Sequence, residues 1–324
     1  MSRVVTEHYD FLLNQAEAAR MCLIPDNASA HRHYNHLVSK GKLIAPLRGI
    51  FARREYWDSL APDKRHLHMV RALSKKHPDW VFSHFTAALV YGLYVSYSDL
   101  QLIHRSIGYC VKSKHEGICC HSVGVRGSEE VSGIRVTSFE QTVYDCLRLS
   151  DFKHGLPIAD SACRLRGLLP GDLLGIIDSF SGKYTGGLAT ARLAAQHSNG
   201  KSESGGESIA RAAMLMNGYL IPELQVWFPD PVDEGERFRV DFYWELPGKG
   251  QLIGEFDGKG KYVDPGLTSG RELEDILIDE RKRESHINAL RIPVMRMSYA
   301  DVCNDAVFQN LMDAFGVPRV SEAW

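Results

Sequence analysis

The sequence predicts a protein of mixed α+β class with three domains, at residues 1–60, 61–200 and 201–324. A chain of 324 residues is longer than one ordinary domain. Residues 197–206 are rich in Gly and Ser, a linker composition that favours a boundary near residue 200. Beyond that boundary the patterns follow the order helix, three strands, helix, strand, helix, which predicts a sheet flanked by helices.

The composition is that of an ordinary globular protein, with 44% hydrophobic and 24% charged residues. No signal-peptide pattern and no run of 18 uncharged apolar residues is present, so we expect a cytoplasmic protein without a membrane segment. The seven Cys residues include no Cys-x-x-Cys and are interpreted as reduced thiols. Basic residues outnumber acidic ones up to residue 200 and the reverse holds after it, which fits a front half that meets phosphates.

The first 60 residues show the order helix, turn, helix and basic hairpin. Residues 6–20 have a helical apolar period, and Asp26 or Ser29 can cap a second helix. Residues 43–54 predict two short strands, and the whole order is typical of a winged helix. The alternative is a small helical domain with a solvated basic face. The side chains expected to reach DNA phosphates are Arg32, His36, Arg48, Arg53 and Arg54.

The middle region, residues 61–200, offers no catalytic group. Ser83 and His84 are adjacent, but no third acid that would orient the histidine is evident, and Ser83 is expected to cap a helix. Ser138 is the expected cap of a later helix. Asp145 and Asp160 are far apart in sequence, and we expect structural roles for both.

The most informative stretch is a predicted β-hairpin over residues 239–257. Its first strand contains Asp241, and its second contains Glu255 and Asp257, which point to the same face because they are two residues apart. Acids are depleted in strands, and like charges this close repel one another unless a cation lies between them. Converging carboxylates are ligands that Mg²⁺ prefers. The alternative, a solvated strand face, is disfavoured by the many apolar residues of the hairpin.

The front half resembles the AbiEi-type antitoxin regulators. The similar residues are Gly41 with the Arg-Gly-Ile-Phe of residues 48–51, then residues 83–93, and then residues 133–145. The resemblance implies an N-terminal winged helix followed by an AbiEi-like α/β domain, with DNA as the partner. A cognate nucleotidyltransferase toxin is implied by this likeness alone, and a homodimer is left open.

The back half resembles the Vsr-like branch of the PD-(D/E)XK nucleases. The similar residues are Glu207, the Val-Asp-Phe of residues 240–242 and the Glu-Phe-Asp-Gly of residues 255–258, with Glu280, Arg283 and Glu284 on the next helix. The resemblance implies Mg²⁺ or Mn²⁺ held by Asp241, Glu255 and Asp257. Glu207 would complete a second metal site or polarise the attacking water. Arg283 would contact the scissile phosphate, unless it pairs with Glu280 or Asp279 on its own helix.

The expected catalytic lysine departs from the family pattern, in which it follows an acid by two residues. Counted from Glu255 that position holds Asp257, and counted from Asp257 it holds Lys259. Lys261 matches the longer Glu-Phe-Asp-Gly-x-x-Lys-Tyr pattern better. Both Lys259 and Lys261 therefore stay candidates for orienting the attacking water.

Taken together, these features predict a metal-dependent DNA endonuclease that hydrolyses phosphodiester bonds, with a winged helix for DNA targeting, in phage defence or DNA repair. The alternative is an AbiEi-like transcriptional regulator whose nuclease-like half is an inactive scaffold. An RNA-cleaving toxin with the same core is a third reading, because the chemistry does not depend on the sugar. Retention of all four acids, Glu207, Asp241, Glu255 and Asp257, favours the enzyme.

Overall fold

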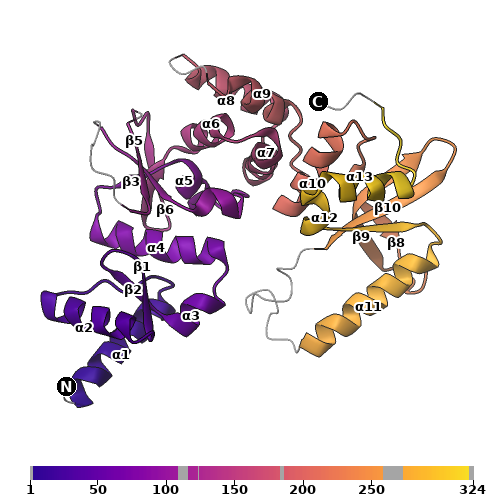
Figure 1. Cartoon of the computed structure of the whole chain (residues 1–324). Helices are drawn as coiled ribbons and strands as arrows, with labels where there is room; N and C mark the ends of the chain where they lie inside the picture. The colour runs from indigo at the N-terminus through magenta and orange to yellow at the C-terminus, as the bar shows by residue number, and fades with distance from the viewer. Residues whose placement is uncertain (1–2, 109–115, 123, 183–185, 258–272, 321–324) are drawn as a thin grey trace. The chain divides into compact units, whose positions relative to one another are not determined.

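The computed structural model confirms the mixed α+β class. Helices and three separate sheets make up the part of the chain it describes (Figure 1). No helix of that part is long and apolar enough to cross a membrane. The structure describes residues 3–108, 116–122, 124–182, 186–257 and 273–320.

The chain divides into two compact units, each interrupted once in sequence. The first comprises Met1–Ser150 and Gly175–Ala191, and the second comprises Asp151–Leu174 and Arg192–Trp324. This division does not test the domain boundaries near residues 60 and 200, which stay predictions.

The first unit begins with two helices and a small hairpin. Helix α2 starts after Asn27, whose side chain accepts a hydrogen bond from the Ala30 backbone N–H at 2.9 Å, so the cap is Asn27 rather than Asp26 or Ser29. Strand β1 pairs antiparallel with β2, and Gly49 at their turn has a φ of +80°, a value that favours glycine. The elements are α1 (Arg3–Ala18), α2 (Ala28–Ser39), β1 (Leu43–Leu47), β2 (Ile50–Arg53), α3 (Arg54–Ser59) and α4 (Pro62–Lys76).

A five-stranded sheet of order β5-β4-β3-β7-β6 forms the rest of the first unit. Side chains of α4 and α5 pack with those of its strands in one apolar cluster. Ser138 caps α6 as predicted, accepting a hydrogen bond from the Gln141 backbone N–H at 3.3 Å. The elements are β3 (Val81–Phe82), α5 (His84–Tyr91), a 3-10 helix (Tyr97–Leu100), β4 (Ile103–Ser106), β5 (Ile118–His121), β6 (Ser128–Val131), β7 (Ile134–Thr137) and α6 (Phe139–Leu149).

The second unit contains a four-stranded sheet of order β11-β10-β9-β8. Strands β8, β9 and β10 are antiparallel, and β10 pairs parallel with β11. The elements follow the order predicted beyond residue 200, with one short extra helix, α12. They are α10 (Gly205–Met216), β8 (Glu223–Pro229), β9 (Arg237–Leu246), β10 (Gly250–Asp257), α11 (Leu273–Ala289), β11 (Val294–Ser298), α12 (Tyr299–Cys303) and α13 (Asp305–Ala314).

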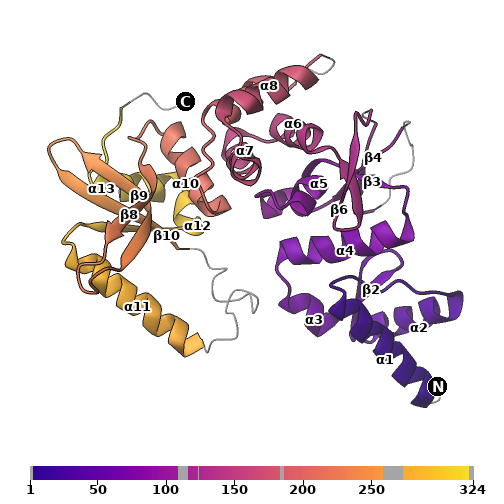
Figure 2. The same cartoon turned by 180° about the vertical axis from the view of Figure 1, so that it is seen from behind.

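Helices cover both faces of this sheet. Figures 1 and 2 show α11 on one side of it and α10, α12 and α13 on the other. The two layers have separate apolar cores: Ile287 of α11 packs with Ile253, whereas Phe308 of α13 packs with Trp244. A central sheet buried on both sides gives low-dielectric surroundings to any acid within its strands.

Helix α7 (Phe152–Arg166) belongs to the second unit and supports α10. Asp160 is fully buried and forms an ion pair with Arg211 of α10 at 2.7 Å. Asp160 also accepts a hydrogen bond from the Asn199 backbone N–H at 2.7 Å. The remaining helices are α8 (Pro170–Phe180) and α9 (Leu188–Gln196).

Part of the Gly/Ser-rich segment before α10 is packed against the neighbouring helices. Ser202 is fully buried, and its hydroxyl lies 2.8 Å from that of Ser208. A Cβ at Gly200 would lie 3.2 Å from the Arg164 backbone nitrogen. The small residues at these positions therefore allow close packing against α7.

Candidate active site

Asp241 lies where the ladder between β9 and β10 ends. Backbone pairing runs from the Leu246–Gly250 pair to the Phe242–Gly254 pair. Beyond it, the Asp241 carboxylate oxygen Oδ2 accepts a hydrogen bond from the Phe256 backbone N–H at 2.9 Å. A side chain thus replaces a backbone partner here, and this holds the carboxylate between the two strands.

The regular alternation of β9 breaks at Asp241. Val240 and Phe242 are two residues apart, yet Val240 packs with the α11 layer and Phe242 with the α10 layer. On the neighbouring strand β8, Gln225 has a φ of +58°, which is unusual for a residue other than glycine. Such local irregularities re-aim side chains and are frequent at functional sites.

Gln225 joins two of the predicted acids. Its amide nitrogen Nε2 donates to Glu207 Oε2 at 3.0 Å and to Asp241 Oδ1 at 3.4 Å. A neutral donor between two carboxylates satisfies their oxygens but does not cancel their charge. Sequence reasoning missed Gln225, because the register that places it beside Asp241 depends on how β8 pairs with β9.

Glu207 enters the site from the first turn of α10. Ser204 caps this helix by accepting from the Glu207 backbone N–H at 3.1 Å, and Glu207 Oε2 in turn accepts from the Glu203 backbone N–H at 2.9 Å. The side chain is only 5% exposed. Burial raises the pKa of Glu207, and the nearby Asp241 charge raises it further.

The approach of α10 to the sheet depends on Gly206. A Cβ at this position would lie 2.1 Å from Cε1 of the Phe256 ring. Any larger residue must therefore displace either the helix or the ring. The glycine lets the first turn of α10 lie directly on β10, and this contact places Glu207 beside Asp241.

Glu255 is buried on β10 and is paired with an arginine. It is 5% exposed, and both its oxygens accept from Arg283 Nη2 of α11, at 3.1 and 3.2 Å. Burial raises the pKa of Glu255 to about 7, since it outweighs the opposing effect of Arg283, and the Asp241 charge adds to the rise. The pKa values of Glu207 and Glu255 thus both respond to the same Asp241 carboxylate.

Arg283 bridges the helix and the sheet. Besides Glu255, its Nη2 donates to the Arg239 backbone oxygen at 2.9 Å. The predicted contact of Arg283 with a phosphate stays a prediction. The side chains of Asp279 and Glu280, its alternative partners, lie outside the described residues.

Asp257 lies at the end of β10 in a different ionic group. Its side chain is 50% exposed and accepts from Arg296 of β11 at 2.9 Å. Arg296 also lies 3.4 Å from Glu284 and feels the Glu255 charge. Asp257 and Glu255 thus share one face, as the spacing predicted. The candidate lysines Lys259 and Lys261 lie outside the described residues.

Glu207, Asp241 and Glu255 are not among the groups of side chains whose possible ligand atoms all lie within 4.8 Å of one another. Within the described ranges, two other groups of three side chains each bring one ligand atom within 4.8 Å of the others. They are His104 with Cys119 and His121, and Asp230 with Asp233 and His286.

Apart from Arg283, the residues predicted to bind DNA lie on the first unit, and some are exposed whereas Arg53 is engaged in ion pairs. Arg32, His36 and Arg48 are exposed. Arg53, in contrast, forms an ion pair with Glu17 at 2.8 Å and a longer one with Asp10 at 3.5 Å. Arg54 is exposed and its Nε donates to the Gly41 backbone oxygen at 3.1 Å.

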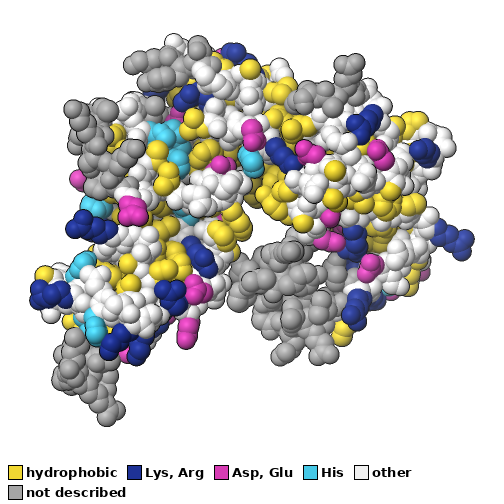
Figure 3. Space-filling model, in the orientation of Figure 1, with side chains coloured by type: hydrophobic (Ala, Val, Ile, Leu, Met, Phe, Trp, Pro, Cys, Tyr) yellow, Lys and Arg dark blue, Asp and Glu magenta, His cyan; other side chains and the backbone are white. Residues whose placement is uncertain are grey.

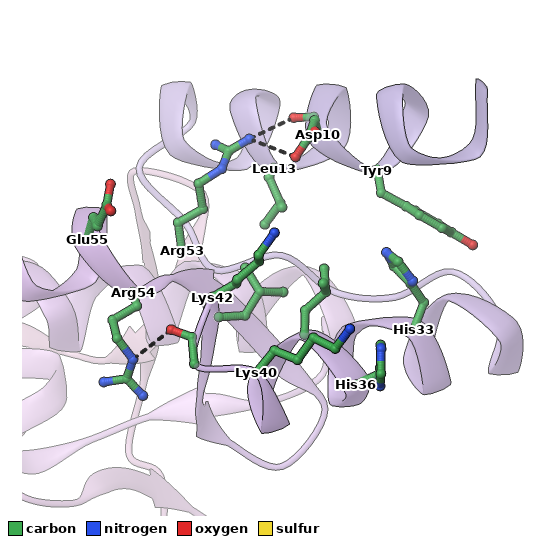
Figure 4. A pocket seen from close by; sticks show the side chains of 13 residues that line it. Tyr9, Asp10, Leu13, His33, His36, Lys40, Lys42, Arg53, Arg54 and Glu55 are labelled. Atoms are coloured by element: carbon green, nitrogen blue, oxygen red, sulfur yellow. Dashed lines mark hydrogen bonds and ion pairs between the residues drawn. The ribbon is translucent and has the colours of Figure 1, made fainter. Parts of the chain in front are cut away.

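Some of these residues line a groove of about 780 Å³ between α1, α2 and the start of α3. Figure 4 shows Arg53 reaching toward Asp10 on one side of the groove. In Figure 3, Lys, Arg and His side chains are visible over the N-terminal elements. The lining contains the cationic side chains of Lys40, Lys42, Arg53 and Arg54, together with the imidazole rings of His33 and His36.

The structure therefore brings together Glu207, Asp241 and Glu255 from three separate elements, whereas Asp257 pairs with Arg296 in a separate, half-exposed ionic group. The chain was also compared with protein-family models, with curated proteins and with solved structures, and none of them matches it. Any function for these residues has to follow from their own chemistry and geometry.

Proposed function

We propose that this protein is a divalent-metal-dependent nuclease that hydrolyses phosphodiester bonds in DNA. The observation that carries the proposal is the gathering of Glu207, Asp241 and Glu255 from α10, β9 and β10, with the pKa values of both glutamates raised. Buried acids that repel one another destabilise the fold, and such groups are frequent at functional sites. Because these acids lie on a sheet flanked by helices in the order helix, three strands, helix, strand, we also propose that the second unit has the PD-(D/E)XK fold.

The donor set fits Mg²⁺ or Mn²⁺. Carboxylate oxygens are the ligands that these hard cations prefer. Asp241 and Glu255 would hold the ion directly, with Glu207 acting through a water. Such an ion, when bound, polarises a phosphate and lowers the pKa of a bound water.

Each residue of the proposed site then has a separate role. Asp241, fixed by the Phe256 N–H, keeps its remaining oxygen toward Gln225 and Glu207. Glu207, whose pKa is raised by burial and by the Asp241 charge, is the candidate to accept a proton from the attacking water. Arg283 holds Glu255 in the free protein and can turn toward a phosphate when a cation takes over its partner.

A surface for the nucleic acid adjoins these acids along β8 and β9. Trp227, two residues from Gln225, is 52% exposed. The guanidinium groups of Arg239 and Arg237 lie 5.4 and 5.9 Å from its ring centre. An exposed aromatic ring between cations is a suitable surface for stacking a base beside its phosphate.

For the first unit we propose a winged helix that binds DNA. The support is the order of α1, α2 and the β1–β2 hairpin, together with the exposed Arg32 and Arg48. Positive side chains on such a module bind phosphates without reading sequence.

The test is cleavage of supercoiled plasmid DNA, and of single-stranded RNA in parallel, with Mg²⁺ or Mn²⁺. Asp241→Asn and Glu255→Gln keep the shape of the side chains and remove charge. We expect the cleavage rate of each variant to be at least about a hundredfold lower than that of the wild type. Glu245→Gln, an exposed acid on the same strand as Asp241, is the matched control and should keep full activity.

Two results would contradict the proposal. One is cutting that persists in the Asp241→Asn variant. The other is specific DNA binding without cutting under any divalent metal, which would favour the regulator with an inactive nuclease-like scaffold. Cutting of RNA but not DNA would keep the metal chemistry and change the substrate.

A further inference from the structure

A second group of ligand-type side chains lies in the first unit. His104 is on β4, and Cys119 and His121 are on the edge strand β5. The two strands are parallel, with His104 opposite Cys119 and Ser106 opposite His121, so the three side chains share one face of the sheet. One ligand atom from each lies within 4.8 Å of the others.

Histidine rings are tightly grouped at this point. His104 Nδ1 lies 2.8 Å from His121 Nε2, so two ring nitrogens meet directly. The ring of His84, the first residue of α5, is stacked on His121 with centroids 3.5 Å apart. His84 has a φ of +51°, a strained value for a histidine. In Figure 3 a patch of His side chains is visible over the sheet of this unit.

The environment keeps these imidazoles neutral. Burial, reinforced by the neighbouring histidines, lowers the pKa of His104 to about 3 and that of His84 to about 2. Burial also lowers the pKa of His121.

We propose that His104, Cys119 and His121 form a binding site for Zn²⁺, with a fourth position open to water. Two imidazoles and a thiolate suit this borderline ion and not Mg²⁺. In tetrahedral coordination, two nitrogens about 2.05 Å from zinc lie roughly 3.3 Å apart. The 2.8 Å contact between the two rings must therefore widen by about half an ångström, a small side-chain rotation.

The surroundings support and also limit the site. The His104 backbone N–H donates to Thr86 Oγ1 at 2.8 Å, and that hydroxyl lies 2.9 Å from His66 Nε2, so β4 is held firmly against α4 and α5. The positive charge of Arg148 acts on His84 and His121 and disfavours a further cation. Burial and the neighbouring Cys120 raise the pKa of the Cys119 thiol, so binding of the ion must release its proton to solvent. The thiolate formed in this way would offset the Arg148 charge.

Metal binding at this point would clamp the edge strand β5 onto β4. The two strands share four paired positions, from Ile103–Ile118 to Ser106–His121, and β5 has no strand on its other side among the described residues. A ligand from β4 and two from β5 would tie the strands together more strongly than the ladder alone. The proposed ion would therefore stabilise the edge strand, and its site is independent of the carboxylates of the second unit.

The test is metal content and Co²⁺ spectroscopy of the full chain. After incubation with Zn²⁺ and removal of excess, we expect one equivalent in the wild type and less than about a tenth of that in Cys119→Ser and His121→Asn. Co²⁺ in the same site should give an intense thiolate charge-transfer band and the visible bands of a tetrahedral ion. Cys120→Ser, the adjacent thiol, is the matched control and should behave as the wild type.

A second control separates this site from the other cluster. His286→Gln removes a residue of the Asp230 group and should leave the zinc content unchanged. If Cys119→Ser fails to fold by circular dichroism, the Co²⁺ titration of the wild type decides. A charge-transfer band that Cys120→Ser retains supports the site. Absence of that band, or zinc that follows His286 or Cys120 instead, overturns the proposal.

Discussion

At the scale of single residues, the proposed site contains two buried glutamates, Glu207 and Glu255, that lie near the negative charge of Asp241. Glu207 and Glu255 each feel the charge of Asp241, and each has a donor that compensates it only partly: Gln225 for Glu207 and Arg283 for Glu255. A bound divalent cation would remove this repulsion, whereas in its absence the protonated glutamates are favoured.

Glu255→Gln is predicted to change the pH dependence of stability. The folded protein holds the Glu255 proton up to about pH 7, against an ordinary pKa of 4.5, so this residue's contribution to stability is lost as the pH rises through about 7. Glutamine cannot ionise. In chelator, urea unfolding should show the variant to be more stable than the wild type at pH 8 by roughly 1–3 kcal/mol and nearly equal at pH 4.5.

Saturating Mg²⁺ should abolish or reverse that advantage, because the ion binds the ionised carboxylate and not the amide. A difference in stability that stays constant from pH 4.5 to pH 8 would show that Glu255 titrates as an ordinary surface acid.

At the scale of elements, the site is set by how α10 meets β10. Gly206 allows the contact, and the buried ion pair between Asp160 and Arg211 ties α10 to α7. Both features lie outside the residues that carry the chemistry. Changes at either position should therefore act on stability first and on activity through the position of Glu207.

Gly206→Ala is predicted to destabilise the second unit. The added methyl group would overlap the Phe256 ring, and overpacking of this kind costs about 1–3 kcal/mol. Gly175→Ala in α8 is the matched control. Nothing lies within 4 Å of its Cβ, so it should be neutral or stabilise by about 0.5–1 kcal/mol. Thermal or urea unfolding measures both, and equal stability of the two variants would mean that α10 does not lie this close to Phe256.

Asp160→Ala is predicted to cost about 3–5 kcal/mol in urea unfolding, because Arg211 would stay buried without a partner. The double variant Asp160→Leu/Arg211→Met should recover most of that loss, since it removes both charges. Asp151→Ala is the comparison: this acid is 65% exposed and caps α7 by accepting from the His154 backbone N–H at 2.8 Å, so its loss should cost only about 0.5–2 kcal/mol. A loss in the double variant equal to that of the single one would argue against the buried pair.

The order of elements could be predicted from the sequence, whereas the local geometry of the site could not. The hairpin acids and the strand order of the second unit follow from apolar alternation and the Pro-Gly turn. The broken alternation at Asp241 and the left-handed Gln225 depend on pairing between strands, which periodicity does not encode. The close packing at Gly200 could not be predicted either, because small residues serve close packing as well as flexibility.

The group of His104, Cys119 and His121 escaped prediction for a related reason. The spacing of His104 from the other two residues matches no compact metal motif, and only the parallel pairing of β4 with β5 brings them together. The sequence likewise could not show that Arg53 forms an ion pair with Glu17, whereas Arg48 is exposed to solvent.

At the scale of the whole molecule, the proposed function combines DNA binding by a basic N-terminal surface with metal-dependent cutting by the second unit of the same chain. The two contributions are separable by ionic strength, because phosphate contacts weaken with salt whereas a metal site made of buried acids is screened less. Binding and cutting should accordingly respond to different substitutions.

Arg32→Ala and Arg48→Ala are predicted to lower the affinity for DNA by a similar factor whatever the DNA sequence, and to make that affinity less dependent on salt concentration. Each lost phosphate contact should reduce the slope of log affinity against log salt by about 1. Arg53→Ala is the comparison: its side chain is engaged by Asp10 and Glu17, so it should lower stability more than the slope. Fluorescence anisotropy over a series of salt concentrations measures the slopes. Identical slopes for the wild type and both exposed variants would place the DNA surface elsewhere.

The central claim, that Asp241 and Glu255 together bind a divalent cation, is tested most directly by a Mn²⁺ titration followed by electron paramagnetic resonance. This measurement requires no knowledge of the substrate. The wild type should bind Mn²⁺, Asp241→Asn and Glu255→Gln should bind it at least about tenfold more weakly, and Cys119→Ser should match the wild type. Identical isotherms for the wild type and Asp241→Asn, or no binding by the wild type at millimolar Mn²⁺, would contradict the claim.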